Sequence, residues 1–114
     1  MKIQTFVEHF DEPLYLESGR ILETYDLKYE MYGEMNEDKS NVIIVFHALT
    51  GSHHAAGRYE GETKAGWWDP LIGDGKIVDT TKHCVVCANI LGSCFGSSGP
   101  MSTNPKTKEP LRLK

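Results

Sequence analysis

The feature that most constrains this 114-residue chain is a pair of strongly apolar segments, Val42–Phe46 and Val85–Leu91. Both are rich in β-branched residues. A short, continuous apolar run of this kind is typical of a strand that is covered on both faces. Such strands usually belong to a parallel sheet with helices packed against each side. The sequence therefore predicts an α/β protein.

The sequence between and after these two segments contains no good long amphipathic helix. Residues 51–83 are rich in Gly and Trp, and the Gly, Ser and Pro residues of 92–110 do not support a long helix. A parallel sheet with almost no covering helices would leave apolar faces in water. We therefore interpret residues 1–114 as the N-terminal fragment of a larger α/β domain, with an incomplete sheet.

The first part of the chain predicts antiparallel β structure that leads into the parallel strands. Within Tyr25–Met31 apolar residues alternate with charged ones, which is the period of a half-buried strand. The charged residues are Asp26, Lys28 and Glu30. Shorter strands near Ile3–Val7 and Leu14–Leu16 could pair with it, with a turn at Ser18 and Gly19. The polar segment Gly33–Ser40 ends this region.

Charge and hydropathy argue against several classes of partner. The formal net charge of -4 argues against a nucleic-acid surface, which needs clustered Lys and Arg. No apolar run approaches the ~20 residues that span a bilayer. The N-terminal MKIQTFVEHFDEP has acidic residues where a secretory signal needs an apolar core. We therefore expect a cytoplasmic protein that binds neither nucleic acid nor membrane.

The cysteines and histidines do not predict a metal site. Cys84 and Cys87 form a C-x-x-C, but positions three apart in a strand face opposite sides, so the thiols would not converge on one metal. We interpret them as buried structural cysteines. His53 and His54 have no Asp, Glu or Cys at a recognisable ligand spacing, and with His47 they are expected to be solvated or hydrogen-bonded.

A candidate nucleophile lies in Gly92–Gly96, which reads GSCFG and follows an apolar strand. This G-x-C-x-G has the form of a nucleophile elbow with Cys94 as the nucleophile. An elbow needs a helix next, because the helix N-terminus helps to build the oxyanion site. Ser97–Pro100 is a poor helix start. The favoured interpretation is a glycine-rich loop with a packed Cys94.

Two further stretches have the composition of a site wall and an oxyanion loop. Trp67 and Trp68 precede a predicted helix start at Asp69-Pro70, and we favour packing near a site over direct catalysis for them. His47–Gly51 follows the first apolar strand with small residues and a Gly. Such a loop permits a tight turn that aims backbone N–H groups at an oxyanion, although a generic turn would look similar.

Five stretches in order resemble the homoserine O-acetyltransferase family, which has the α/β-hydrolase fold. They are YEMYGEMN (Tyr29–Asn36), VIIVFHALTGSHHAAG (Val42–Gly57), GWWDPLIGDGKIVDT (Gly66–Thr80), CANILGSCFGSSGP (Cys87–Pro100) and STNPKT (Ser102–Thr107). HALTGS and GWWDPLIGDG are much more specific to this family than to the fold at large. The resemblance covers nearly everything up to Thr107.

The resemblance implies a role for one residue and an activity for the complete enzyme. The HALTG loop of this family gives a backbone N–H to the oxyanion hole, which maps to Leu49, and GSCFGSSGP is a loop. The enzyme transfers an acetyl group from its co-substrate acetyl-CoA to L-homoserine through an acyl-serine, in methionine synthesis. The implied partners are these small molecules and a second copy in a homodimer, with no bound cofactor.

The chain departs from the family's pattern in two ways. It has no G-x-S-x-G elbow, so the nucleophilic Ser and its Asp and His are expected outside this chain. Lys108–Lys114 reads KEPLRLK instead of the family's continuation, which we interpret as a frameshift or early stop. The fragment is therefore expected to be inactive alone. A succinyl donor, a serine acceptor or water as acceptor, and a free-standing small binding or interaction protein, remain the alternatives.

Overall fold

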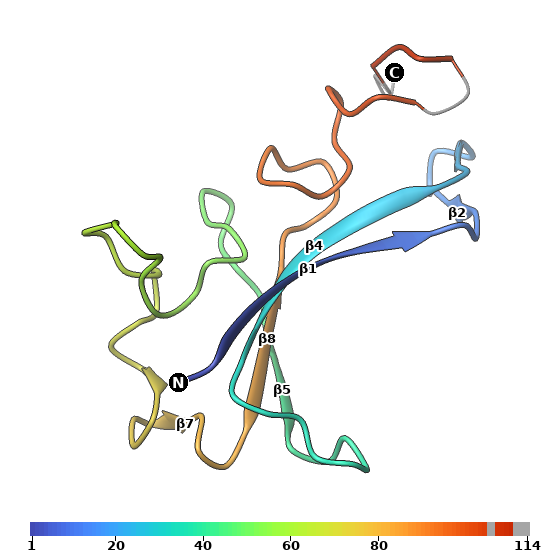
Figure 1. The fold of residues 1–114 in the computed structure, drawn as a ribbon. Coiled ribbons are helices and arrows are strands. Elements are labelled where there is room, and N and C mark those ends of the chain that lie inside the picture. The colour runs from blue at the N-terminus through green and yellow to red at the C-terminus, as the bar shows by residue number, and fades with distance from the viewer. Residues whose placement is uncertain (105–106, 111–114) are drawn as a thin grey trace. The chain divides into compact units, whose positions relative to one another are not determined.

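The computed structural model describes residues 1–104 and 107–110. Part of the STNPKT stretch and most of the KEPLRLK tail therefore lie outside the described residues. The regular structure of the described residues is all β, without an α-helix (Figure 1). The strands are β1 (Ile3–Phe10), β2 (Leu14–Tyr15), β3 (Ile21–Leu22), β4 (Tyr25–Tyr32), β5 (Val42–Val45), β6 (Ile72–Gly73), β7 (Val78–Asp79) and β8 (Cys84–Ala88).

Four of these strands form one mixed sheet in the order β1-β4-β8-β5 (Figure 1). Strand β4 pairs with β8 in antiparallel fashion, and Glu30 lies opposite Cys87. Strand β5 pairs with β8 in parallel, with Val42 opposite Cys84 and Val45 opposite Cys87. The predicted change from antiparallel to parallel pairing is therefore confirmed, and it occurs at β8.

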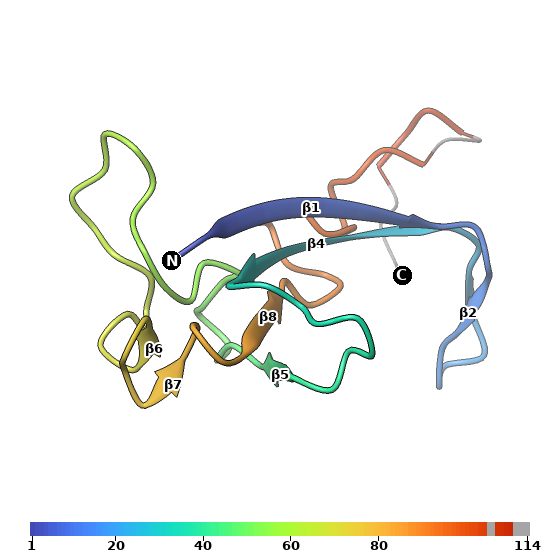
Figure 2. The same ribbon diagram turned by 60° about the horizontal axis from the view of Figure 1, so that its bottom comes forward.

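The two remaining strand pairs are short. Strands β2 and β3 form an antiparallel pair, and the N–H of Gly19 donates to the carbonyl of Leu16 at 2.9 Å in the turn between them. The predicted turn is confirmed, but the expected pairing of Leu14–Leu16 with the Tyr25–Met31 strand is wrong. The turn reverses the chain within a few residues, so β2 pairs with Ile21–Leu22, the segment that directly follows the turn. Strands β6 and β7 pair in parallel (Figure 2).

The chain divides into two compact units, one made of Met1–Phe6 and Tyr29–Ala88, the other of Val7–Lys28 and Asn89–Lys114. The buried apolar core lies in the first unit. Its members are Tyr32, Val45, Ala55, Ala56, Ile72, Val85 and Cys87. In the second unit, Ser98 donates its N–H to the carbonyl of Asp26 at 2.9 Å. This contact anchors the segment after β8 to the first half of β4.

Two sequence predictions fail in the first unit. Strand β5 was expected to be covered on both faces, yet Ile44 is 63% exposed and Phe46, just beyond the strand, is 81% exposed. No helix of the described residues covers this edge strand. The expected helix start at Asp69-Pro70 is a turn, in which Leu71 and Ile72 both donate N–H groups to the carbonyl of Trp68. No helix follows this turn, because Ile72 is already the first residue of β6.

Membrane insertion by a helix finds no support in the described part of the chain. None of its segments forms a helix long and apolar enough to cross a bilayer.

Candidate active-site turn

The chain makes a tight turn shortly after β5, at Ala48–Gly51. The N–H of Gly51 donates to the carbonyl of Ala48 at 2.8 Å, which places Leu49 and Thr50 at the corners. The Nδ1 atom of His47 also lies 2.7 Å from that carbonyl. A Cβ on Gly51 would lie 3.0 Å from the Cβ of His47 and 3.2 Å from the Ala48 oxygen, so crowding favours glycine here. The predicted tight turn is therefore present.

Leu49 presents its backbone N–H at the first corner of this turn. Its side chain is 93% exposed. The closing bond of a β-turn uses the N–H of the fourth residue and leaves that of the second unused. Within the described residues the Leu49 N–H makes no hydrogen bond. A donor held at a turn corner without a protein partner can bind an oxyanion, as an oxyanion hole requires. That role stays a prediction.

The segment after the turn is fixed at Ser52. Its carbonyl accepts a hydrogen bond from the indole Nε1 of Trp67 at 2.9 Å and a weak one from the Sγ of Cys87 at 3.8 Å. Trp67 and Trp68 pack against each other with ring centroids 5.4 Å apart. The indole of Trp67 therefore holds the loop that carries the turn, while Trp67 and Trp68 stay 37% and 41% exposed. The packing role of the pair near a site stays a prediction.

A polar cluster around a buried carboxylate, which sequence reasoning missed, adjoins this segment; its outermost member, Tyr59, is 37% exposed. We call Glu30, Tyr32, His53, His54 and Tyr59 the Glu30 cluster. Glu30 was expected on the solvent face of its strand, but it is fully buried. The Tyr59 hydroxyl lies 2.9 Å from one carboxylate oxygen, and His54 Nδ1 lies 2.9 Å from the other. The prediction fails because a loop distant in sequence covers this face and supplies hydrogen-bond donors.

The Glu30 carboxylate affects the titration of its neighbours. Burial first, and then hydrogen bonding to Glu30, raise the pKa of Tyr59. Burial and the charge of Glu30 likewise raise the pKa of Tyr32. Both tyrosines are therefore neutral near pH 7 and can donate their hydroxyl protons. The sequence signal for this cluster is slight: His53, His54 and Tyr59 are donors clustered in one loop, but nothing pairs them with Glu30.

The histidines and two of the cysteines are placed as predicted. His47, His53 and His54 each have a hydrogen-bond contact, which confirms the hydrogen-bonded alternative. Cys84 and Cys87 are buried. Burial, and secondarily the Glu30 charge, raises the pKa of Cys87 to about 11. Among the described residues, no group of three or more His, Cys, Asp or Glu side chains could hold a metal ion.

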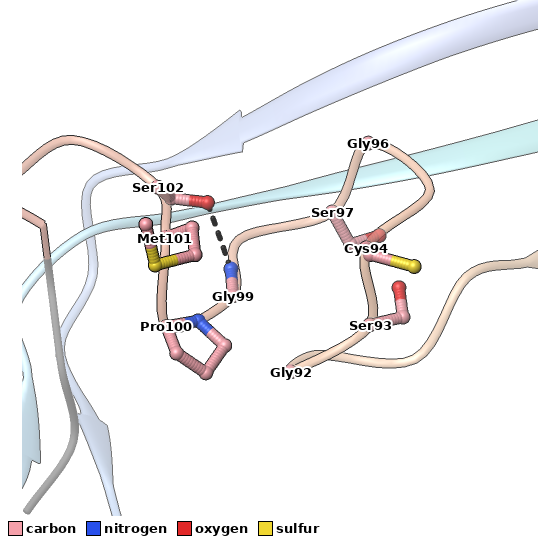
Figure 3. Close-up of a pocket in the computed structure, with 9 residues that line it drawn as sticks. All are labelled: Gly92, Ser93, Cys94, Gly96, Ser97, Gly99, Pro100, Met101 and Ser102. Atoms are coloured by element: carbon pink, nitrogen blue, oxygen red, sulfur yellow. Dashed lines mark hydrogen bonds between the residues drawn. The ribbon is translucent and has the colours of Figure 1, made fainter.

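The GSCFGSSGP segment is a loop, as expected, with no helix after Cys94. The expectation that Cys94 is packed is wrong, because the thiol is exposed. Gly96 adopts a positive φ of 117°, and Ser97 and Ser98 then bond to β4, which leaves Cys94 on the outside of the bend. The loop lines a cavity of about 360 Å³ (Figure 3). Within the lining segment the Gly99 N–H donates to the Ser102 hydroxyl at 2.8 Å.

Comparison with known sequences identifies close relatives. No family model matches the chain. It is 66% identical, over all 114 residues, to a homoserine O-acetyltransferase of Sulfurimonas autotrophica and spans 31% of that relative. It is also 61% identical over 103 residues, 90% of the chain, to a homoserine O-succinyltransferase of Comamonas testosteroni, of which it spans 25%. The chain thus covers less than a third of each of these relatives.

Comparison with solved structures gives a matching result. The homoserine O-acetyltransferase from Bacillus anthracis superposes with a TM-score of 0.85 at 33% identity, over 96% of this chain and 31% of that one. Esterase E22 superposes with a TM-score of 0.84, also at 33% identity and with the same coverage. The chain is therefore similar to homoserine O-acetyltransferases, in sequence over its whole length and in fold over 96% of it, and its strands match part of an α/β-hydrolase sheet.

Proposed function

We propose that residues 1–114 form the oxyanion-hole section of a homoserine O-acetyltransferase, with the backbone N–H of Leu49 as one donor. The observation that carries the proposal is the Ala48–Gly51 turn, which presents a donor without a partner among the described residues shortly after a parallel strand. The 66% identity to a homoserine O-acetyltransferase supports the assignment of the reaction.

The proposed reaction has two acyl-transfer steps. A serine outside these 114 residues attacks the thioester carbonyl of acetyl-CoA, the C–S bond breaks, and the thiol of CoA leaves. The hydroxyl of L-homoserine then attacks the acyl-serine and takes the acetyl group, which restores the serine. Each step passes through a tetrahedral oxyanion. The Leu49 N–H would stabilise that negative charge, and the serine's Asp and His partners would also come from outside the section.

A hydrolase with the same oxyanion hole is the second candidate. Esterase E22 superposes on this chain about as well as the Bacillus anthracis enzyme does. The donor at Leu49 would act in the same way if water replaced L-homoserine as the acceptor. The succinyltransferase relative leaves the acyl donor as a further choice. Residues outside this section would make both selections.

A hybrid enzyme tests the proposal. In this hybrid enzyme, residues 1–114 replace the matching section of the Sulfurimonas autotrophica relative. We expect it to release the thiol of CoA from acetyl-CoA in repeated turnovers only when L-homoserine is present, because without the acceptor the acyl-serine persists after one equivalent is released. The 114-residue chain alone is expected to release none, since it lacks the nucleophile. Gel filtration of the hybrid enzyme tests the implied homodimer.

In this hybrid enzyme the acceptor and the acyl donor are selected by residues of the relative, so its activity tests the oxyanion section and not that selection. A hybrid enzyme that folds, judged by a cooperative thermal transition, but turns over no acyl-CoA would contradict the proposed function.

A further inference from the structure

Glu30 is a buried acid whose hydrogen-bond partners lie in the loop after the proposed oxyanion turn. Glu30 lies on β4 and its side chain is fully buried, and no Lys or Arg of the described residues pairs with it. A buried carboxylate is strongly destabilising unless hydrogen bonds satisfy it. The residues that supply those bonds are therefore held firmly in place by Glu30.

The donors to Glu30 come from both ends of a short loop segment. The Tyr59 hydroxyl lies 2.9 and 3.1 Å from the two carboxylate oxygens. His54 Nδ1 lies 2.9 Å from one of them, and its Nε2 is buried without a partner among the described residues, so Nδ1 is assigned the proton. The His54 and Tyr59 rings stack with centroids 4.0 Å apart. The carboxylate and the stack thus fix residues 54 and 59 together.

Tyr32, two residues further along β4, holds the backbone of the same segment. Its hydroxyl donates to the carbonyl of His53 at 3.0 Å and accepts from the N–H of Ala55 at 2.8 Å. With the single hydroxyl proton used on His53, the 3.4 Å contact to Glu30 adds little. Strand β4 therefore holds the loop in place at three adjacent loop residues. It does so through hydrogen bonds to the side chain of His54 and to the backbone of His53 and Ala55.

These contacts place the proposed oxyanion turn between two fixed ends. On one side, β5 is paired with β8 up to Val45. On the other, the chain is held from Ser52 onward by Trp67 and the Glu30 cluster. Only Phe46–Gly51 lies between. We propose that Glu30 is a positioning residue for the Leu49 N–H, an inference that rests on the proposed function and adds a residue to it.

Hydrogen exchange on the hybrid enzyme tests the positioning without any assay of activity. In Glu30→Gln an amide NH₂ replaces one acceptor oxygen, so Tyr59 and His54 must share the single oxygen that remains, and their hydrogen bonds to the side chain are weakened. We expect the Gly51 amide, which closes the turn, to exchange about tenfold faster. The Cys84 amide, bonded to the Asn41 carbonyl, is expected to keep its rate. The matched control Glu34→Gln, at an exposed acid, should change neither rate.

Two hydrogen-exchange results would overturn the positioning role. One is an unchanged Gly51 rate in Glu30→Gln. The other is an equal acceleration at Gly51 and Cys84, which would mean that Glu30 stabilises the unit as a whole. If Glu30→Gln does not fold, Tyr59→Phe removes one donor hydroxyl and keeps the ring. The same two amides are then measured against the same expectations.

Kinetics in the hybrid enzyme separates the two proposals. Glu30→Gln is expected to lower kcat by about 10–100-fold with little change in KM, because a displaced donor mainly affects the transition state. In a Leu49→Pro background, which lacks the donor N–H, the same change should cost about twofold or less. Equal losses in both backgrounds would overturn only the positioning role. No loss from Leu49→Pro itself would overturn the oxyanion assignment.

Discussion

Replacing Leu49 with proline in the hybrid enzyme is expected to lower kcat by about 10²–10³-fold while the protein remains folded. Proline has no N–H, so the substitution removes the proposed oxyanion donor. It is also compatible with the local backbone. Leu49 is the second residue of the Ala48–Gly51 turn, where proline is favoured, and it is not among the described residues with positive φ. Steady-state kinetics with acetyl-CoA and L-homoserine measures the loss.

The matched control for this change is Leu49→Ala, which keeps the N–H and removes only an exposed side chain. We expect it to change both the free energy of unfolding and the activation free energy that sets kcat by no more than about 0.5 kcal/mol. KM should change little in either variant, because the oxyanion exists only at the transition state. Equal losses in the two variants would show that the side chain matters rather than the donor. A proline variant with full activity would remove Leu49 from the site.

Replacing Gly66 with alanine is expected to destabilise the first unit by more than about 3 kcal/mol. A Cβ at this position would overlap the Ala55 carbonyl carbon and the Ala56 nitrogen and would lie 2.6 Å from the Ala55 oxygen. The backbone segments around Gly57 and Gly66 lie side by side here, because the Gly66 N–H donates to the carbonyl of Gly57 at 2.8 Å. Since the obstructing atoms are buried backbone, they cannot move aside as a side chain would.

A thermal melt of the 114-residue chain checks this expectation. A loss of that size corresponds to a decrease in Tm of roughly 12 °C or more for a domain of about 100 residues. The control is Gly61→Ala, at a glycine with φ of 82° and open space around it. It should cost only about 1–2 kcal/mol, the strain of a left-handed alanine. If the Tm of the Gly66→Ala variant is no lower than that of the Gly61→Ala variant, the two backbone segments do not approach each other as closely as described.

The strands were predictable because their apolar patterns are local. Strand β5 (Val42–Val45) lies within the predicted Val42–Phe46, β8 (Cys84–Ala88) overlaps the first half of the predicted Val85–Leu91, and Tyr25–Met31 lies within β4. The tight turn around Leu49 followed from the small residues and the Gly after an apolar strand. These features depend on neighbours in sequence, which is why composition and period were sufficient to predict them.

The features that were missed depend on residues far apart in the chain. The alternation in β4 placed Glu30 in solvent, yet a loop more than twenty residues later covers it and supplies His54 and Tyr59. The exposure of Cys94 depends on two serines that bond to β4 some seventy residues earlier. Periodicity describes which faces a strand has, but it does not show which segment covers each face.

The most direct test of the central claim is a crystal structure of the hybrid enzyme with its serine bound to a tetrahedral phosphonate that mimics the oxyanion. The account predicts that the phosphonyl oxygen lies about 2.7–3.1 Å from the backbone nitrogen of Leu49, with the Ala48–Gly51 turn unchanged. A phosphonyl oxygen held by other donors, with the Leu49 N–H directed elsewhere, would contradict it.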